Sequence, residues 1–246
     1  MPAPIVFVSG GQLGDFFHQL SVVKEAYMTT GRKGILYIDD RGGSRWFARG
    51  VRATYDDIYS LIAKEPYIEA FQIYQGQRYD HDLSDWTQVP NLYTRSWRET
   101  FSKYGYGWNS SAYIHVDPMP GYEDVTFVST SHRWNNRIDY SILLAHIHNP
   151  MFLAVTKETY DDFVKRTGIT SLQLIICADA VSLARTIWGC RLFVGTLSMP
   201  LALADAMGKD RVAILPESPD ADIAVRSDSR YISVPDDIPR MFKRYA

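Results

Sequence analysis

The sequence has little of what marks several large classes of protein. Its only cysteines, Cys177 and Cys190, each lie in an apolar stretch, which indicates buried small residues rather than a disulfide framework. The formal net charge is −2, so no basic field favours nucleic acid or a membrane surface. No apolar run approaches the roughly 18 residues that span a bilayer, and residues 1–4 lack the features of a signal peptide. We therefore expect a cytoplasmic protein with no membrane span and no nucleic-acid partner.

Motifs of several enzyme chemistries are missing as well. The chain has no P-loop, no HExxH and no CxxC pattern. Its acidic pairs, 39–40 and 161–162, do not make a metal-ligand constellation, and the second pair falls on the polar side of an expected helix. We expect no metal and no bound cofactor.

Aromatic residues are abundant, at 13% of the 246 residues, with 16 tyrosines and 6 tryptophans. Many of them fall between Tyr55 and Tyr122, among glycine, aspartate and arginine. Rings of this kind either stack on sugars and fill an interface or pack irregularly under long loops. The sequence leaves both possibilities open.

The first 40 residues predict a βαβ unit. Residues 5–8 form an apolar run that ends at a glycine pair, as a buried strand entering a tight turn does. A second apolar run, 35–38, ends at Asp39. Between the runs, apolar residues recur on one helical face: Leu13, Phe16, Phe17, Leu20, Val23 and Tyr27. Beyond residue 41 the pattern is poor, with a helix expected at 55–64 and a strand at 68–74.

The second half of the chain alternates strands and helices. Strands are expected at 126–128, 151–155, 172–176, 192–194 and 212–215, and helices at 138–146, 157–166, 180–188 and 200–207. Asp179 is expected to cap the third of these helices. The alternation predicts an α/β fold of two Rossmann-like halves, 1–121 and 122–246, with parallel sheets covered by helices on both faces.

Ligands of open parallel sheets bind beyond the carboxyl ends of the strands, which selects three loops. The first follows the strand at 5–8 and carries Gly11, Gly14 and Asp15. Glycines let the backbone approach a ligand, and a helix start offers free N–H groups. Asp15 either acts as a general base toward a hydroxyl or only complements the helix dipole.

The second loop, 129–137, carries His132, Arg133 and Arg137. Guanidinium groups donate bidentate hydrogen bonds that suit a diphosphate. The alternative is a solvated polar loop without a ligand.

The third loop follows the strand at 192–194. Gly195, Thr196 and Ser198 lead into a helix, and the hydroxyls with the helix N-terminus make either a phosphate site or a plain helix cap. Glu217, just past the last strand, is a candidate acceptor for ribose hydroxyls.

Several of these segments resemble the family 9, heptosyltransferase-like glycosyltransferases. The opening Gly11-x-x-Gly14-Asp15 before an amphipathic helix is similar to the start of that family. Residues 180–198 and 202–208 resemble its donor-side helix, strand and helix, and they look still more like short glycosyltransferase-like proteins of phages and bacteria, as does 133–140. The resemblance covers about residues 5–40 and 124–216.

The resemblance implies a metal-independent GT-B enzyme. Its N-terminal half would hold an acceptor and its C-terminal half a nucleotide-activated sugar, on either side of a cleft. Asp15 would deprotonate the acceptor hydroxyl, His132 and Arg133 would stabilise the leaving diphosphate, and Ser198 would contact phosphate.

The chain departs from the family pattern in its last donor-side turn. Where the family shows Asp-[ST]-Gly and then a His, this sequence has Leu197-Ser198-Met199 and Ala202. This departure favours a second hypothesis, a non-catalytic binding or assembly module on the same fold. A third hypothesis is a dinucleotide-binding enzyme, because Ser9, Gly11 and Gly14 occupy GxGxxG spacing and Asp39 ends the next strand.

Overall fold

The computed structural model describes residues 2–88, 97–106, 111–217, 230–243 and 245, which form two compact units. Unit 1 comprises Met1–His115 together with Ala206–Gly208, and unit 2 comprises Val116–Asp205 and Lys209–Ala246. The chain therefore enters unit 1 twice. The two segments of unit 1 are hydrogen-bonded to each other, because the N–H groups of Tyr113 and Ile114 both donate to the Ala206 carbonyl, at 2.8 and 3.1 Å.

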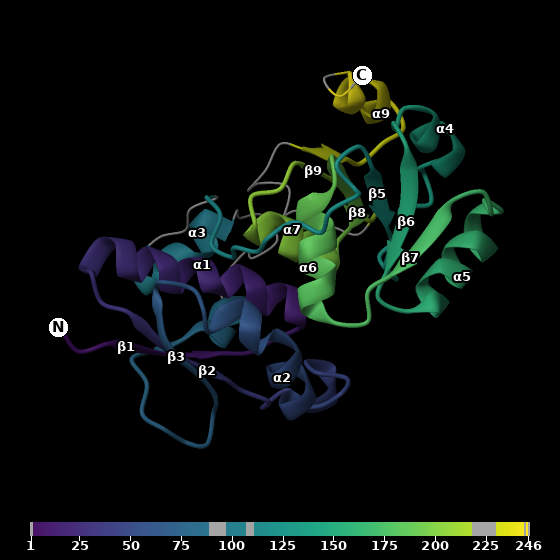
Figure 1. The fold of residues 1–246 in the computed structure, drawn as a ribbon. Helices are drawn as coiled ribbons and strands as arrows, with labels where there is room; N and C mark the ends of the chain where they lie inside the picture. Colours follow the sequence, from purple (N-terminus) through teal and green to yellow (C-terminus); the bar gives the residue numbers. More distant parts are fainter. Residues whose placement is uncertain (1, 89–96, 107–110, 218–229, 244, 246) are drawn as a thin grey trace. The chain divides into compact units, whose positions relative to one another are not determined.

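Unit 1 contains a four-stranded parallel sheet in the order β3-β2-β1-β4. The strands are β1 (Ile5–Ser9), β2 (Gly34–Ile38), β3 (Ile68–Ile73) and β4 (His81–Asp82). The α-helices are α1 (Leu13–Thr30), α2 (Val51–Ile62) and the short α3 (Trp97–Phe101), and 3-10 turns lie at Gly43–Arg45, Leu83–Gln88 and Ser102–Tyr104. Helices α1 and α2 lie on the same face of the sheet, as expected for two successive right-handed βαβ crossovers (Figure 1).

Helix α1 follows the apolar pattern of its sequence. Phe16, Phe17, Leu20 and Val23 are completely buried against the sheet. The helix ends at Gly31, whose φ of 69° is the left-handed conformation that glycine adopts at little cost. The predicted βαβ unit is confirmed.

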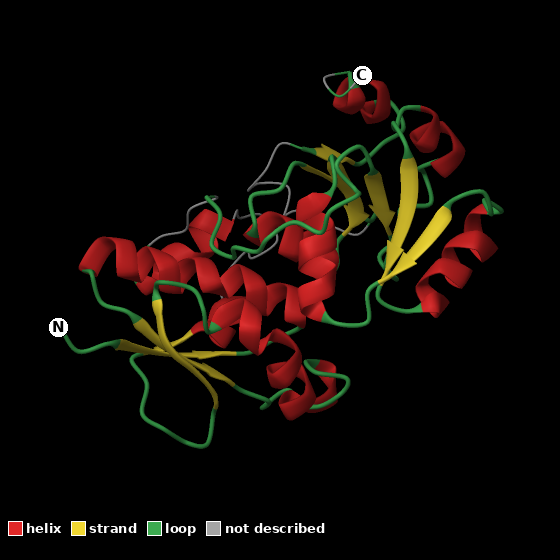
Figure 2. Cartoon of the chain, in the orientation of Figure 1, coloured by secondary structure: helices red, strands yellow, loops and turns green. Residues whose placement is uncertain are grey.

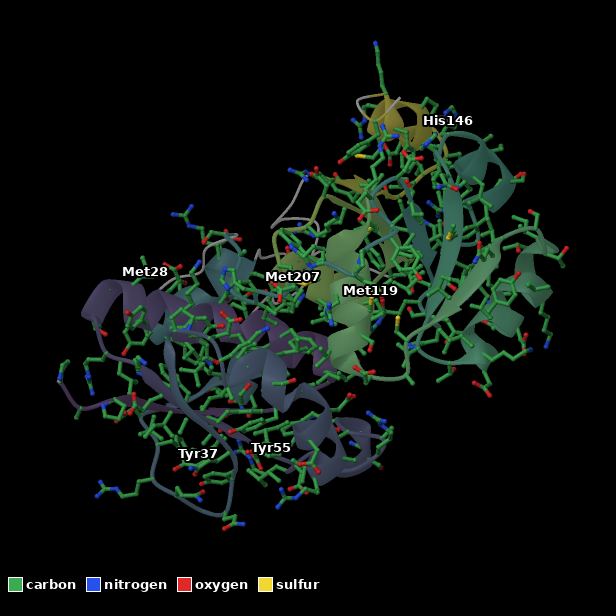
Figure 3. All side chains as sticks on the ribbon, in the orientation of Figure 1. Met28, Tyr37, Tyr55, Met119, His146 and Met207 are labelled. Carbon is green, nitrogen blue, oxygen red and sulfur yellow. The ribbon has the colours of Figure 1, made fainter. Side chains whose placement is uncertain are left out.

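The aromatic residues of the middle segment supply core. Trp86, Trp97, Phe101 and Tyr104 are all buried, and the Trp97 ring stacks on Phe101 with centroids 5.1 Å apart. Packing under long loops, one of the two alternatives above, therefore holds for these four rings. A further group of rings lies around Tyr55, which is labelled in Figure 3. The centroid of the Tyr55 ring is 5.0 Å from that of Phe71 and 5.3 Å from that of Tyr59.

Unit 2 contains a six-stranded parallel sheet in the order β10-β9-β8-β5-β6-β7. The strands are β5 (Thr126–Ser129), β6 (Pro150–Ala154), β7 (Gln173–Ile176), β8 (Leu192–Thr196), β9 (Arg211–Ile214) and β10 (Tyr231–Ile232). The helices are α4 (Tyr140–Ala145), α5 (Lys157–Thr167), α6 (Ala180–Gly189), α7 (Met199–Ala206) and α9 (Asp237–Phe242). Helices α5 and α6 lie on opposite faces of the sheet (Figures 1 and 2). The predicted α/β class with parallel sheets is confirmed.

Side-chain caps set two helix starts in unit 2. Asp179 accepts a hydrogen bond from the Ser182 N–H at 2.7 Å, so the predicted cap of α6 is confirmed. Asp139 accepts from the Ser141 N–H at 2.8 Å and starts α4 at Tyr140, two positions later than expected. Strand β10 and helix α9 were not predicted. No helix in the described ranges has the length and hydropathy to cross a bilayer.

Candidate functional site

The strand order of unit 2 places a reversal between β5 and β8. The chain runs from β5 outward to β6 and β7, then returns to β8 on the other side of β5. In open parallel sheets this reversal leaves a crevice at the carboxyl ends of the two central strands, where ligands bind. The loops that leave β5 and β8 are the second and third loops selected from the sequence, and both lie at this edge.

One hydroxyl joins the two loops. Ser131 Oγ, after β5, donates to the Leu197 carbonyl after β8 at 3.0 Å, and it accepts from Thr196 Oγ1 at 3.0 Å. The same oxygen accepts the Arg133 N–H at 3.2 Å. Sequence reasoning did not single out Ser131, because a serine among several polar residues carries no signal of a partner 66 residues away.

Arg133 lies beside this junction. Its Nη1 donates to the Leu197 carbonyl at 3.4 Å, and its side chain is half-buried. His132 and Arg137 are exposed, and the Arg137 N–H donates to Asn135 Oδ1 at 3.0 Å. The structure thus joins Arg133 to the loop after β8.

Gly195 has a different place from the one expected. It is the fourth residue of β8, not part of a turn, and it pairs with Ser129 and Ala213. A Cβ at this position would lie 2.8 Å from the Phe193 ring and 3.2 Å from the Ser129 carbonyl oxygen. Close packing between strands explains this glycine, and the turn itself is made by Leu197 and Ser198.

Ser198 occupies the N-cap position of α7, because its carbonyl accepts the Ala202 N–H at 3.0 Å. Its hydroxyl donates backward to the Thr196 carbonyl at 2.9 Å, and Thr196 is completely buried. The serine hydroxyl thus donates within the turn and does not cap α7. The first N–H groups of a helix have no acceptor within the helix itself. Pro200, in the first turn of the helix, has no N–H to offer.

A buried asparagine fixes the loop after β5 to the neighbouring strands. Asn135 Nδ2 donates to the carbonyls of Leu215 and Ser233 at 2.8 and 2.9 Å, beyond the ends of β9 and β10. Asn135 lies within the loop 129–137, and no role was predicted for it. Glu217 follows β9 and is exposed.

In unit 1 the loop after β1 is a tight turn at Gly10–Gln12. Gly11 has φ 114°, which glycine adopts and side-chain-bearing residues rarely do. A Cβ on Gly10 would lie 2.5 Å from Cζ3 of Trp46, so that ring packs directly on the turn. Gly14 lies in the first turn of α1 rather than in the loop.

Asp15 lies in the first turn of α1 and is half-buried. A Cβ on Gly11 would lie 3.4 Å from the Asp15 Cβ, which places the aspartate against the glycine turn. A carboxylate in the first turn of a helix complements the positive end of the helix dipole. This placement fits both roles considered for Asp15, base and dipole complement.

The other strand ends of unit 1 carry an ion-pair cluster. Arg41, after β2, pairs with the buried Asp39 and reaches Asp82 at the end of β4 at 2.6 Å, and it donates to Ser84 Oγ at 3.0 Å. Partial burial opposes the charge, but the hydrogen bonds to Asp82 and Asp39 prevail and raise the pKa of Arg41. Asp39 is therefore engaged by Arg41, and it would have to leave this partner to bind a ribose.

The structure leaves part of the predicted site untested. In unit 2 it joins Arg133 and Thr196 through Ser131 and bonds the Ser198 hydroxyl to the Thr196 carbonyl, and in unit 1 it places Asp15 beside Gly11. The shared cleft stays a prediction. Among the described residues, no three His, Cys, Asp or Glu side chains are grouped so as to hold a metal ion.

Comparison with solved structures identifies proteins of the same fold. A glycosyltransferase family 9 protein from Veillonella parvula DSM 2008 superposes with a TM-score of 0.62 at 12% identity, over 98% of this chain and 89% of that one. The E. coli heptosyltransferase WaaC, solved with ADP-2-deoxy-2-fluoro heptose, gives 0.55 at 12% identity, over 86% and 88%. E. coli ADP-heptose lps heptosyltransferase II gives 0.57 at 11% identity, over 93% and 90%.

No protein-family profile matches the sequence, and none of the curated proteins matches it either. At 11–12% identity the structural likeness shows the fold alone. That fold is the heptosyltransferase-like GT-B fold of family 9, as the resemblance implied.

Proposed function

We propose, on the premise that this chain has the GT-B fold of family 9 glycosyltransferases, that it transfers a sugar from a nucleotide-activated donor to a hydroxyl acceptor without a metal ion. The structural neighbours include a heptosyltransferase solved with ADP and with an ADP-heptose analogue, which supports a nucleotide sugar as the donor class. For the acceptor we propose no more than a hydroxyl compound.

One observation carries the proposal: the Ser131 junction at the strand reversal of unit 2. It joins the loop that bears Arg133 to the loop that starts α7. A guanidinium group and the N–H groups of a helix start are the donors that a diphosphate requires. A junction fixed before the donor binds costs little reorganisation when charge develops on the leaving group.

The chemical step then divides between Asp15, which acts on the acceptor, and Arg133, which acts on the leaving group. The Asp15 carboxylate takes the proton of the acceptor hydroxyl, and the oxygen forms a bond to the anomeric carbon of the donor. The bond from that carbon to the diphosphate oxygen breaks, and the electron pair leaves with the nucleoside diphosphate. Arg133 offsets the new negative charge, with His132 and the backbone N–H groups that follow Ser198 at the start of α7 as further donors, so that no metal is required.

The first test is binding of the leaving group. We expect ADP, UDP, GDP or CDP to bind at micromolar to millimolar concentration in a calorimetric or NMR titration, with shifts at the Ser198 turn. Arg133→Ala is expected to weaken binding about tenfold or more, which corresponds to about 1.4 kcal/mol and fits the loss of one charge-assisted contact. Arg52→Ala, which removes an exposed arginine paired with Asp56 on α2 of unit 1, is the matched control.

Absence of binding for all four nucleotides at millimolar concentration would refute the donor assignment. If they bind, Asp15→Asn tests catalysis: we expect transfer to fall by about 10²- to 10⁴-fold while nucleotide binding is unchanged.

The alternative of a non-catalytic module has its own support. The turn before α7 lacks the family's Asp, Gly and His, and Pro200 removes one N–H from the helix start. Nucleotide binding with a biological role that is unchanged by Asp15→Asn would favour this alternative over transfer.

A further inference from the structure

The turn after β1 is held by a residue of α1 to which no role has been assigned above. Gln19 lies on α1, four positions after Asp15 and thus on the same side of the helix. Its Oε1 accepts from Ser9 Oγ at 2.6 Å, and its Nε2 donates to the Gly10 carbonyl at 2.7 Å. One amide therefore holds both residues that lead from β1 into the turn.

Both partners in this pair are removed from water. Ser9 and Gln19 have no exposed surface, and a buried polar pair of this kind has no solvent to replace a lost partner. Glutamine donates and accepts at once, and this pair uses both capacities: the hydroxyl needs an acceptor and the carbonyl needs a donor. Leucine offers neither, and ionised glutamate offers only the acceptor.

The turn above this amide has little freedom of its own. Gly11 has φ 114°, and glycine at such a position would otherwise sample many conformations. The Trp46 ring also packs on Gly10. A Cβ on Gly11 would lie 3.6 Å from both Gln19 Nε2 and Asp15 Oδ2, so the turn lies against both side chains.

We propose that Gln19 is a positioning residue that holds the Ser9–Gly11 turn against Asp15, and so fixes the approach of the acceptor hydroxyl to that carboxylate. This inference rests on the proposed function for its catalytic part. Its structural part, the immobilised turn, stands independently. A misplacement of about 1 Å at a reacting group is enough to reduce a rate about a hundredfold, so a single amide can matter in this way.

The test compares Gln19→Leu with Gln19→Glu. The substrate is the ADP-, UDP-, GDP- or CDP-sugar whose nucleotide binds in the titration described above. The readout is the rate at which the protein hydrolyses this nucleotide sugar, with water as the acceptor. We expect Gln19→Leu to lower kcat at least tenfold at every pH, with KM for the nucleotide sugar unchanged within twofold. In Gln19→Glu we expect a loss of kcat at high pH. At low pH we expect kcat to recover in part relative to the unaltered protein at the same pH, because a protonated carboxyl again donates to Gly10 and accepts from Ser9.

Tyr67→Phe is the matched control. It removes another buried hydrogen bond of unit 1, from Tyr67 Oη to the Tyr113 carbonyl at 2.5 Å, far from the turn along the chain. We expect it to lower the midpoint of thermal unfolding about as much as Gln19→Leu, with kcat unchanged. If it lowers kcat equally, or if Gln19→Glu shows no recovery at low pH, Gln19 has only a structural role and the proposal is wrong.

A second readout separates this inference from the proposed function. Amide hydrogen exchange of residues 10–15 is expected to accelerate at least tenfold in Gln19→Leu and in Ser9→Ala, and to stay unchanged in Tyr67→Phe. Faster exchange without any turnover by the unaltered protein would refute the transfer activity and retain the immobilised turn. Unchanged exchange in both variants would overturn the inference itself.

Discussion

The turn after β1 and the turn after β8 each follow the carboxyl end of an inner strand of a parallel sheet, but they are held by different means. The first depends on a positive φ at Gly11, on the amide of Gln19 and on the Trp46 ring. The second has no glycine in the turn and is held by the hydroxyls of Ser131 and Ser198. A glycine close to a strand end therefore does not by itself show that the backbone needs glycine to turn.

The strongest test of this difference changes the glycines. We expect Gly11→Ala to destabilise unit 1 by about 1–3 kcal/mol, because an alanine at φ 114° is strained whatever space surrounds it. Gly10→Ala is expected to cost a similar amount for another reason, collision with the Trp46 ring. Denaturant unfolding of each variant measures both values.

Trp46→Leu distinguishes the two causes. Added to Gly10→Ala it makes room for the new methyl group, so the double variant should be more stable than the sum of the single effects predicts. Added to Gly11→Ala it should give a simple sum. Equal coupling in both pairs would mean that the turn is not limited by φ at Gly11.

A smaller effect is expected from the hydroxyl junction of unit 2. Ser131→Ala removes hydrogen bonds with Leu197, Thr196 and Arg133, and we expect a loss of about 1–2 kcal/mol in the free energy of unfolding. Thr196→Val removes only the hydrogen bond from Thr196 Oγ1 to Ser131 Oγ. A double-mutant cycle should give a coupling of about 0.5–1 kcal/mol, and additive effects would show that the two hydroxyls do not cooperate.

The smallest effect is expected at the start of α6, where a side chain caps the helix. Asp179 caps α6, and hydrogen bonds from the Ser182 N–H and hydroxyl lower the pKa of its carboxyl. Because the folded pKa lies below the unfolded value of about 3.9, this stabilisation is present above that pH and disappears as the pH falls through the folded pKa. Asp179→Ala should therefore cost about 1 kcal/mol at pH 7 and less at pH 2–3, measured by unfolding at each pH.

Asp179→Asn serves as the reference for that measurement. It retains a side-chain oxygen for the Ser182 N–H and removes the titrating charge, so its stability should change less with pH in this range. A penalty for Asp179→Ala that grows as the pH falls would contradict the capping explanation. Such a cap is what the turns at Gln12 and Ser198 lack, since Gln12 makes no side-chain cap bond and the Ser198 hydroxyl turns back to Thr196.

How much of the fold the sequence reveals depends on the length of its connections. In unit 2, apolar runs and helical stripes alternate with short loops, and the strands and helices from β5 to β9 were all predicted near their observed positions. In unit 1, β4 has only His81 and Asp82, too short for any alternation to register, and its place beside β1 depends on pairing with a distant strand. The rings of Trp86 and Trp97 gave no periodic signal because they pack from irregular segments.

The candidate site divides in the same way. Arg133, Thr196 and Ser198 were predicted because strand ends carry ligand loops and these residue types suit phosphate. Ser131, Asn135 and Gln19 were not, because each works through a hydrogen bond whose partner only the folded backbone reveals. The displacement of Gly195 from turn to strand has the same origin, since the close contact with Ser129 is invisible along the chain.

The double entry of the chain into unit 1 has a consequence for how the protein is made. As the polypeptide leaves the ribosome, residues 1–115 emerge with the N–H groups of Tyr113 and Ile114 still lacking their shared acceptor. That acceptor, the Ala206 carbonyl, is synthesised only after most of unit 2. The N-terminal unit therefore cannot complete these hydrogen bonds until residue 206 has been made, and a fragment that stops at His115 would lack three residues of its own unit.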